Sequence, residues 1–338
     1  GKLKAGIDFI YNAEACNKLN TLLLEQRPDI VHFHNIYHQL TPALIGVAKR
    51  FGCKTVLTAH DYKIVCPSYT MLRDGHVCDD CLTGSVSNAF RHRCQQGDTF
   101  KSLLLSLEAY WQKFAQNYAM LDCIIAPSEF MRQTLLRKLP RSRIDVIVNG
   151  IDASTTVPGD TAGDYFLYIG RLSREKGVAT LALAQQKMQQ SMPLKIVGDG
   201  PLGSDLRARF SGPEFLGYMR HGEALNALIR GARAVIVPSE YYENCSMSVL
   251  EAMAFGRPVV GGNIGGIPEQ IRDGIDGYLV EPGDADALAR IMDSLAANPQ
   301  QAREMGINAR QRLEDKYDLA RHMQVLQELY QQLVGEAK

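Results

Sequence analysis

Residues 234–261 read Ala-Val-Ile-Val-Pro-Ser-Glu-Tyr-Tyr-Glu-Asn-Cys-Ser-Met-Ser-Val-Leu-Glu-Ala-Met-Ala-Phe-Gly-Arg-Pro-Val-Val-Gly. Two short apolar runs, 234–237 and 259–261, flank a polar loop and a longer stretch, 246–255. Because Gly256 and Pro258 end that stretch, it predicts a helix between two strands. Parallel strands need a crossover of this kind. The segment therefore predicts an α/β fold with a parallel sheet.

The same alternation runs through the chain and predicts two Rossmann-like domains. We expect an amino-terminal domain at 1–150, with a Cys-rich insertion at 62–98, and a carboxyl-terminal domain at 151–338. The linker is expected at 149–164, and the last helix, 317–338, could pack on either domain. The expected strands are 29–33, 54–58, 122–126, 144–148, 165–169, 194–197, 234–237, 259–261 and 277–280, and the expected helices are 14–26, 42–51, 102–118, 129–139 and 246–255.

The composition is that of a globular protein of 338 residues, 46% hydrophobic and 22% charged, with a formal net charge of zero. Residues 1–150 carry 18 basic against 13 acidic side chains, and the remainder carries 19 against 24. This balance does not suggest a nucleic-acid partner, which needs a concentrated basic face. With no apolar run near 18 residues and no signal segment at the start, we expect a cytoplasmic protein.

Two carboxylates and two cations suggest a site for a sugar joined to a diphosphate. Glu243 and Glu251 bracket the start of the helix expected at 246–255, and Arg171 and Lys176 lie in a glycine-bounded loop after an earlier strand. Carboxylates accept bonds from sugar hydroxyls, while cations and free helix N–H groups bind phosphate. Loops after parallel strands share one rim of the sheet, where ligands bind. The alternative is a chance pair of glutamates, with Glu243 capping the helix.

At this point the chain resembles the retaining, nucleotide-sugar-dependent glycosyltransferases of family four, which have the two-domain GT-B fold. The motifs that carry the resemblance are Val31-His32-Phe33-His34-Asn35, Thr58-Ala59-His60-Asp61, Ala126-Pro127-Ser128, Tyr168-Ile169-Gly170-Arg171-Leu172 with Lys176-Gly177, Val197-Gly198-Asp199-Gly200-Pro201, Pro238-Ser239, the pair Glu243 and Glu251, and Gly265-Gly266-Ile267-Pro268-Glu269. Each motif is weak alone, but their order and spacing are specific. The resemblance implies an α/β protein whose two Rossmann-like domains face a central cleft.

The resemblance also implies roles for individual residues. Arg171 and Lys176 would hold the donor diphosphate, Glu251 the ribose, and Glu243 the donor sugar, which His60 would reach from the first domain. These make His60, Arg171, Lys176 and Glu243 the expected catalytic residues. The expected donor-binding residues are Gly170, Gly217, Tyr218, Asn244, Cys245, Ser246, Met247, Ser248, Val249 and Glu251.

The family likeness implies a hexosyltransferase that retains the anomeric configuration, with departure and attack on one face of the sugar. The negative charge of the diphosphate grows as the sugar–phosphate bond stretches, and fixed cations and N–H donors stabilise it. With Arg171 and Lys176 in place, we expect catalysis to need no divalent metal or other cofactor. The partners implied are a nucleoside-diphosphate sugar and a glycan or lipid-linked acceptor in bacterial surface-polysaccharide synthesis.

The histidines of the first domain are candidates for the other half of the site. His60 follows the strand at 54–58 and is expected at the rim, with a structural histidine as the alternative. His34 and Asn35, at the end of the strand at 29–33, are weaker candidates for the acceptor region. We expect His32 to face away from His34.

Four cysteines gather in the insertion: Cys66, Cys78, Cys81 and Cys94. Cys78 and Cys81 have the spacing of a metal knuckle, so a structural zinc is expected. A reduced or redox-active cluster and a coincidence remain open, and His76 and His92 could replace a thiolate.

A basic helix could hold the first domain against the inner face of an anionic membrane. Its cations are Arg132, Arg137, Lys138, Arg141 and Arg143. A solvated helix face with an apolar stripe in the core is the alternative.

The chain departs from the family pattern at its start. The usual first strand and glycine-rich loop are expected to be missing, which would leave the amino-terminal domain incomplete. A truncated nucleotide-sugar-binding protein with impaired catalysis is therefore an alternative function, and a nucleotide-sugar epimerase is a third.

Overall fold

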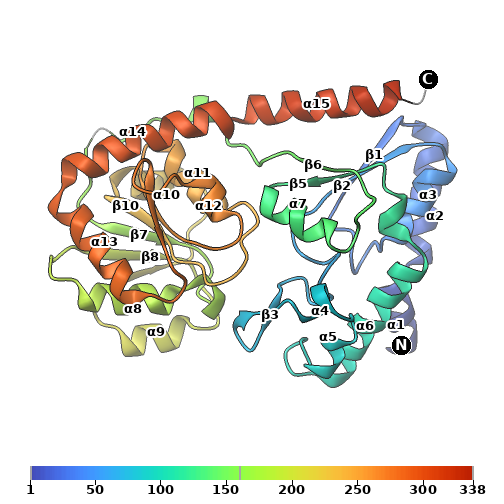
Figure 1. Cartoon of the computed structure of the whole chain (residues 1–338), viewed down its shortest axis with the longest axis horizontal. Coiled ribbons are helices and arrows are strands. Elements are labelled where there is room, and N and C mark those ends of the chain that lie inside the picture. The colour runs from blue at the N-terminus through green and yellow to red at the C-terminus, as the bar shows by residue number, and fades with distance from the viewer. Residues whose placement is uncertain (1, 160, 337–338) are drawn as a thin grey trace. The chain divides into compact units, whose positions relative to one another are not determined.

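The computed structural model of the chain describes residues 2–159 and 161–336, and of residues 2–5 the backbone alone. The chain divides into two compact units (Figure 1). Unit 1 comprises Gly1–Val148 and Gln324–Lys338, and unit 2 comprises Asn149–Met323. The second unit thus ends at Met323, and the last helix, for which the sequence left both domains open, returns to unit 1 from Gln324 onward. Residues 337 and 338 of the expected last helix lie outside the described residues.

Unit 1 is built on a parallel sheet with the strand order β1-β2-β5-β6. Its elements are α1 (Lys2–Ile10), α2 (Ala13–Gln26), β1 (Ile30–His34), α3 (Ala43–Arg50), β2 (Lys54–Thr58), β3 (Leu72–Arg73), β4 (His76–Val77), α4 (Asp80–Thr83), α5 (Asn88–Arg91), α6 (Thr99–Phe114), η1 (Asn117–Met120), β5 (Cys123–Ala126), α7 (Glu129–Leu136) and β6 (Ile144–Val146).

The last helix, α15 (Leu319–Gly335), covers one face of the unit 1 sheet with its second half. Leu329 and Leu333 pack with Val56 and Ile125 of the sheet in one apolar cluster. The ring of Tyr330 meets His32 of β1 edge-on, with 5.8 Å between ring centroids. The amphipathic spacing of this helix therefore reflects a core contact with unit 1.

Unit 2 is built on a second parallel sheet with the order β12-β11-β10-β7-β8-β9. Its elements are η2 (Ala153–Thr155), β7 (Phe166–Ile169), η3 (Arg174–Lys176), α8 (Val178–Lys187), β8 (Leu194–Val197), α9 (Gly203–Arg209), β9 (Glu214–Gly217), α10 (Glu223–Gly231), β10 (Ala234–Val237), α11 (Met247–Ala254), β11 (Val259–Gly262), α12 (Ile267–Gln270), β12 (Gly277–Val280), α13 (Ala285–Ala297) and α14 (Pro299–Lys316).

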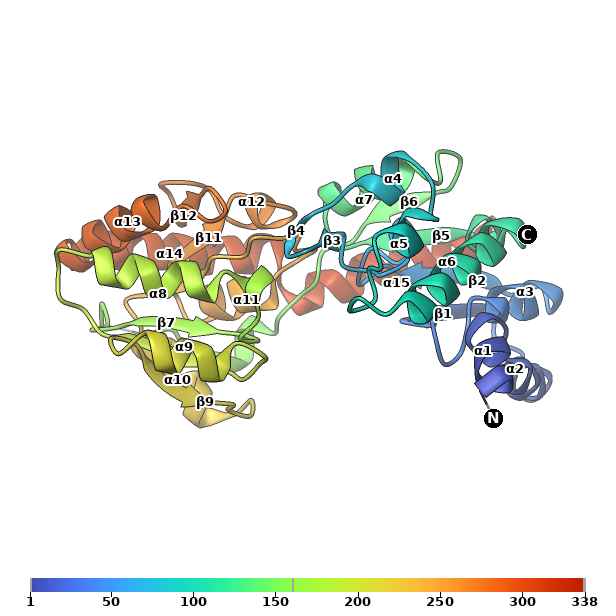
Figure 2. The ribbon, with the colours of Figure 1, turned by 90° about the horizontal axis from the view of Figure 1, so that it is seen from below.

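Helices cover both faces of the unit 2 sheet. Figures 1 and 2 show α8 and α9 on one face and α11 on the other. Phe166 of β7, Leu181 of α8 and Met292 of α13 lie together in a fully buried core cluster. This arrangement confirms the predicted α/β class, and it leaves the ends of the parallel strands free to carry a site.

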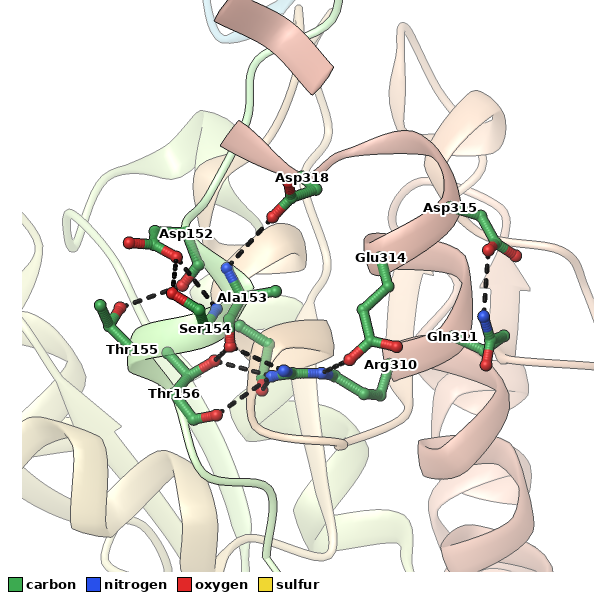
Figure 3. A network of polar contacts seen from close by, with 11 residues as sticks. Asp152, Ala153, Ser154, Thr155, Thr156, Arg310, Gln311, Glu314, Asp315 and Asp318 are labelled. Atoms are coloured by element: carbon green, nitrogen blue, oxygen red, sulfur yellow. Dashed lines mark hydrogen bonds and ion pairs between the residues drawn. The ribbon is translucent and has the colours of Figure 1, made fainter. Parts of the chain in front are cut away.

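The first residues of unit 2, up to Thr156, are held by Arg310 of α14 (Figure 3). The guanidinium donates to the carbonyl oxygen of Ala153 at 2.7 Å and to Oγ1 of Thr156 at 2.7 Å. It also donates to the carbonyl oxygen of Ala254, the last residue of α11. Asp152 caps η2 by accepting from the N–H of Ser154 at 2.9 Å. The expected linker is therefore held by hydrogen bonds over residues 152–156.

Most predicted elements are confirmed, although several bounds differ and helices such as α8, α9, α13 and α14 were given no expected bounds. The helix expected at 102–118 begins at Thr99, because Asp98 caps it by accepting from the N–H of Lys101 at 2.9 Å. It ends at Phe114, before Gln116 adopts a left-handed backbone. Strand β9 and the β3–β4 hairpin were not predicted. Both are too short for an apolar period to stand out.

Candidate functional site

The candidate donor residues lie where the strand order of unit 2 reverses. From β7 the chain continues to β8 and β9 on one side, whereas β10 pairs with the other side of β7. Ligands of open parallel sheets bind at such a switch point, beyond the carboxyl ends of the strands. The loops that follow β7 and β10 carry Lys176 and Glu243. The predicted placement of these loops on one rim is confirmed.

Lys176 and Glu243 form an ion pair, with 2.7 Å between Nζ and Oε1. Glu243 is buried, and its carboxylate also accepts from the hydroxyl of Ser239 at 2.8 Å and from the phenol of Tyr241 at 3.0 Å. Oε1 thus receives two donors and Oε2 one. Since each carboxylate oxygen has two lone pairs, Oε2 can accept one further hydrogen bond.

The electrostatics of this cluster keep Lys176 charged. Burial alone would lower the pKa of Lys176, but Glu243 and Tyr241 together outweigh burial, and the net pKa is raised. The ammonium group also lies 5.0 Å from the centroid of the Tyr241 ring. Burial, followed by the charge of Glu243, raises the pKa of Tyr241 to about 12, so that its phenol remains a donor at neutral pH.

Two glycines allow these loops to approach closely. Gly177 has a φ of +67°, and a Cβ atom there would lie 1.8 Å from the carbonyl oxygen of Pro238. Gly265 has a φ of +63°, and its Cβ would lie 2.5 Å from the carbonyl oxygen of Glu243. Because L residues rarely adopt this backbone and no side chain fits, glycine is needed at both positions.

The start of α11 also favours the binding of an anion in this region. Ser246 precedes the helix, and its side chain makes no capping hydrogen bond among the described residues. Its backbone is instead fixed by Gln270, whose Oε1 accepts from the Ser246 N–H at 2.8 Å. Ser248 donates to the carbonyl oxygen of Ile169, the last residue of β7, at 3.2 Å. The first N–H groups of a helix without a side-chain cap are suited to bind an anion.

Several expected donor-binding residues surround this helix start. Asn244 and Cys245 are half-buried, Met247 is exposed, and Val249 is fully buried, so that only its backbone can meet a ligand. Burial raises the pKa of the Cys245 thiol to about 12 and keeps it protonated at neutral pH. Glu243 does not cap α11, because its carboxylate is directed to Lys176, Ser239 and Tyr241.

Arg171 lies in the same loop as Lys176 but differs from it in exposure and in its contacts. It is exposed, and across residues 2–159 and 161–336 its guanidinium has no hydrogen bond or ion pair. Its carbonyl oxygen accepts from the phenol of Tyr168 at 2.8 Å. Gly170 packs against Gly198, where a Cβ atom would lie 1.9 Å from the Gly170 carbonyl oxygen. The backbone of this loop is thus fixed, and the Arg171 guanidinium is available to a ligand.

Glu251 lies in the second turn of α11, next to the segment that follows β9. Its Oε1 is 3.8 Å from Nδ1 of His221. Burial raises the pKa of Glu251, and the proximity of His221 partly offsets this. Tyr218 is exposed, and its N–H donates to the Asp199 carboxylate at 3.1 Å. Gly217, with a φ of +72°, allows the chain to turn there.

Two histidines of unit 1, His34 and His60, lie together at the carboxyl ends of β1 and β2. Nδ1 of His34 lies 2.8 Å from Nε2 of His60, and the rings are stacked. Asn35, exposed and with a φ of +50°, follows His34. The expectation that His32 faces away from His34 was wrong. Residues two apart in a strand share a face, and the two rings lie 4.3 Å apart.

Known families match both units of the chain. The family described as "Glycosyltransferase Family 4" matches residues 6–155, and that described as "Glycosyl transferases group 1" matches residues 158–312. The chain belongs to glycosyltransferase family four. This confirms the resemblance found in the sequence.

This family-four chain is similar to proteins with several named activities. It is 29% identical over 246 residues to alpha-maltose-1-phosphate synthase of Mycolicibacterium smegmatis, and the match covers 63% of each chain. The chain thus spans less than two thirds of that relative. Sucrose-phosphate synthase from Thermosynechococcus elongatus is 21% identical with a TM-score of 0.73, over 95% of this chain and 77% of that one. HepE from Anabaena, in complex with UDP-glucose, is 19% identical with a TM-score of 0.67, over 94% and 82%. These likenesses confirm the GT-B fold of two Rossmann-like domains.

The cysteines of this family-four chain are free thiols. Cys66 and Cys81 are buried, and Cys78 and Cys94 are half-buried. Burial and then the neighbouring thiols raise the pKa of Cys81 to about 12 and of Cys94 to about 11. In the part of the chain that the structure describes, no three His, Cys, Asp or Glu side chains are placed together to hold a metal ion. The zinc site stays a prediction.

The basic helix expected to meet a membrane is α7 with the residues that follow it. Met131 and Leu135 are fully buried, so its apolar stripe belongs to the core. Arg132 pairs with Glu129 at 2.8 Å, and Arg143 pairs with Asp145 at 3.0 Å. None of the helices in residues 2–159 and 161–336 is long and apolar enough to cross a bilayer. Membrane contact stays a prediction.

Sequence reasoning assigned no role to three residues of the donor region, although Ser239 belongs to one of the quoted motifs. Ser239 and Tyr241 complete the hydrogen bonds of Glu243, and His221 approaches Glu251. Tyr241 could have been found, since it lies two residues before Glu243 in the same loop. His221 gave no signal, because its position depends on how the segment after β9 folds.

Proposed function

We propose that the chain is a retaining glycosyltransferase that moves a sugar from a nucleoside diphosphate to a glycan or lipid-linked acceptor. The observation that carries the proposal is the cluster at the switch point of unit 2. There Lys176, the unpaired Arg171 and the start of α11 lie on the loops after β7 and β10. Cations and free N–H groups of this kind suit a diphosphate.

The chemistry assigned to this cluster is stabilisation of the leaving group. The bond between the anomeric carbon and the diphosphate oxygen breaks, and its electron pair goes to the diphosphate. Lys176 and Arg171 offset the charge that develops there, and such preorganised groups contribute a few kcal/mol each. Because both cations are fixed to the chain, the proposed step needs no divalent metal.

The acidic residues are assigned to recognition. Glu243 has one lone pair left on Oε2 and would accept a bond from a hydroxyl of the donor sugar. Its other lone pairs are occupied by Lys176, Ser239 and Tyr241, which makes it a poor nucleophile. Glu251 would accept from the ribose, with Tyr218 and Gly217 beside the base.

In the proposed reaction the acceptor hydroxyl attacks the face that the diphosphate leaves, so that the configuration is retained. The new bond joins the acceptor oxygen to the anomeric carbon, and the hydroxyl proton passes to an oxygen of the departing diphosphate. His60 would contact the donor sugar, and His34 and Asn35 the acceptor. Burial, assisted at His60 by its partner, lowers the pKa of both histidines. Their neutral rings can accept as well as donate.

The nucleotide and the destination of the product are narrower proposals. UDP-glucose is the first donor to test, because the Anabaena relative of similar fold is in complex with it. Synthesis of a bacterial surface polysaccharide, from the cytoplasm or the inner face of the membrane, rests on the family resemblance alone.

A structural zinc held by Cys66, Cys78, Cys81 and Cys94 is proposed for the insertion of unit 1. The support is the knuckle spacing of Cys78 and Cys81 in the sequence, and zinc would have to draw the thiols together, because the described residues hold no ready-made group of three ligands. Zinc would have to displace thiol protons, so its affinity should rise with pH. Metal analysis of the purified chain should find one zinc per chain, and Cys78→Ser should abolish it while Cys53→Ser, outside the set, should not. A metal-free wild type would contradict this.

Release of nucleotide from a panel of nucleotide sugars, in the presence of a chelator, tests the proposed function. We expect sustained release with at least one donor, faster when a glycan acceptor is added. Donor binding without release would favour the alternative, a nucleotide-sugar-binding protein with impaired catalysis. Release that stops with chelator and returns with magnesium would contradict the metal-free step.

A further inference from the structure

Helix α6 of unit 1 presents a row of large apolar side chains to solvent, which we call the apolar stripe. Its six side chains are between 38% and 81% exposed: Phe100, Leu103, Leu107, Tyr110, Trp111 and Phe114. Since each residue of an α-helix turns by about 100°, all six fall within an arc of about 100°. The apolar stripe therefore follows one face of a helix that is about 24 Å long.

The opposite face of α6 is held in the core of unit 1. The N–H of Phe90 in α5 donates to the hydroxyl of Ser106 at 3.1 Å, and Gln112 donates to the carbonyl oxygen of Ile10 in α1 at 3.3 Å. Helices α5 and α1 thus lie against α6 (Figure 1). A surface helix of a globular protein normally has a polar outer face. An outer face as apolar as this one marks an interaction site.

The charges around the apolar stripe are positive. The only acidic residue of α6 is Glu108, whose side chain is 1% exposed and paired with Lys63. Lys101 and Lys113 are exposed, and by the same rotation they lie on opposite flanks of the apolar stripe. In the part of the chain that the structure describes, Lys113 forms no ion pair. Lys138 lies near it, since its pKa is lowered first by burial and then by the charge of Lys113.

A groove beside Trp111 adds a further cation. The groove has a volume of about 470 Å³, and Tyr11, Trp111 and residues of α3 line it. Arg50, the last residue of α3, is exposed there, and within residues 2–159 and 161–336 it forms no hydrogen bond or ion pair through its side chain. A guanidinium can bind two oxygens of one phosphate. The groove thus places a phosphate-binding side chain at the edge of the apolar stripe.

These features fit a lipid bilayer better than a protein partner. Trp and Tyr have an apolar body and a polar tip, and they gather at the level of the lipid head groups. Lysines can bury their stems in the acyl region and extend their ammonium groups to the phosphates. Protein interfaces are depleted of Lys, whereas here a lysine lies on each flank. An apolar face flanked by cations is typical of helices that lie in a membrane surface.

We propose that α6 lies in the surface of an anionic phospholipid bilayer. The apolar stripe enters the upper part of the acyl chains, and Lys101, Lys113 and Arg50 meet the phosphates. This surface differs from the one expected from the sequence, which was placed on α7. The proposal does not rest on the transfer reaction, because the chain can bind vesicles whether or not it turns over a donor.

The fluorescence of the whole chain tests this proposal, because Trp111 is its only tryptophan. The probes are vesicles of phosphatidylcholine mixed with phosphatidylglycerol, and vesicles of phosphatidylcholine alone. With the mixed vesicles we expect the emission to shift to shorter wavelength, to saturate with lipid, and to be quenched by brominated acyl chains. Phosphatidylcholine alone should bind at least tenfold more weakly, since each cation near an anionic surface contributes about fivefold.

Two variants with matched controls assign the signal to α6, and both keep Trp111. Phe114→Ala should weaken binding to the mixed vesicles about five- to twentyfold. Leu24→Ala, at a position 57% exposed on α2, should change it less than twofold. Lys113→Gln should weaken it about fivefold, and Lys18→Gln, on α2, less than twofold.

The lipid concentration at half of the shift is compared, because the rings of Trp111 and Phe114 lie 6.0 Å apart and the emission itself can differ between variants. The proposal is overturned if the mixed vesicles cause no shift and no quenching, or if both kinds of vesicle bind equally. Equal binding by Phe114→Ala and Leu24→Ala would also overturn it. A shift that appears without lipid as the chain concentration rises, with a dimeric mass in ultracentrifugation, would assign the apolar stripe to a second copy of the chain instead.

Discussion

The ion pair of Lys176 and Glu243 acts as one unit, because the buried Glu243 carboxylate has the Lys176 ammonium 2.7 Å away as its opposite charge. Glu243 is held by three donors, and these fix its carboxylate and the Lys176 ammonium in relation to each other. Breaking a buried pair by removing one partner leaves the other uncompensated. Variants at this pair must therefore be checked for folding before their kinetics are read.

Glu251 allows a cleaner test of nucleotide recognition, since the side chain it approaches is an exposed histidine, His221, at 3.8 Å. We expect Glu251→Ala to weaken UDP binding about tenfold or more, because a hydrogen bond to a charged group contributes about 1.5–3 kcal/mol. Glu304→Ala, an exposed glutamate on α14, is the matched control. Equal calorimetric affinities for the two variants would remove Glu251 from the site.

The pair His34 and His60 predicts that the stability of the folded chain depends on pH. Both pKa values are lowered below 6.5, so the folded chain binds these protons less tightly than the unfolded chain does. Their contribution to stability is therefore complete above about pH 6.5 and is lost as the pH falls through the lowered values.

Nuclear magnetic resonance titration of the two imidazoles should give midpoints below 6.5. In His34→Asn the midpoint of His60 should move upward, since the charge of His34 is one of two causes that lower it. A midpoint of His60 at or above 6.5 in the wild type would refute this account.

At the scale of elements, the donor region depends on how closely the loops after β7 and β10 approach. Besides the Lys176–Glu243 pair, the N–H of Glu240 donates to the carbonyl oxygen of Glu175 at 2.8 Å. Gly177 lies beside this contact, and its missing side chain is what allows it.

Gly177→Ala should destabilise the chain by about 2–4 kcal/mol, through a left-handed backbone and a clash with Pro238. Gly274→Ala separates the two causes, because Gly274 has a φ of +73° but no atom within 4 Å of an added Cβ. It should cost about 1–2 kcal/mol. Chemical denaturation of both variants checks this, and equal losses would show that the loops can move apart freely.

Elements with a strong apolar period were predicted from the sequence almost to the residue. Strand β2 and strand β12 have the expected bounds, because each is a clear apolar run between turn residues. Strand β9 was missed, since Glu214 is exposed and the other three residues are only half-buried. The face of the sheet on which His32 lies was predicted wrongly, because residues two apart in a strand share a face.

In the whole molecule, local sequence patterns predicted the domain boundary near residue 149. They left open whether the last helix packs on the first or the second domain. Residues from Gln324 onward belong to unit 1, because Leu329 and Leu333 meet Val56 and Ile125, which are at least 204 residues away in the sequence (329 − 125 = 204). The apolar period of a helix identifies its apolar face, but it does not identify the sheet that this face covers.

The rate of UDP release from UDP-glucose in the presence of a chelator tests whether Lys176 stabilises the diphosphate as it leaves. Lys187, on α8 and paired with Asp286 at 2.6 Å, provides the matched control. We predict that Lys176→Ala lowers the rate about 10²- to 10³-fold, while Lys187→Ala leaves it unchanged. A folded Lys176→Ala chain that releases UDP as fast as Lys187→Ala would contradict the account.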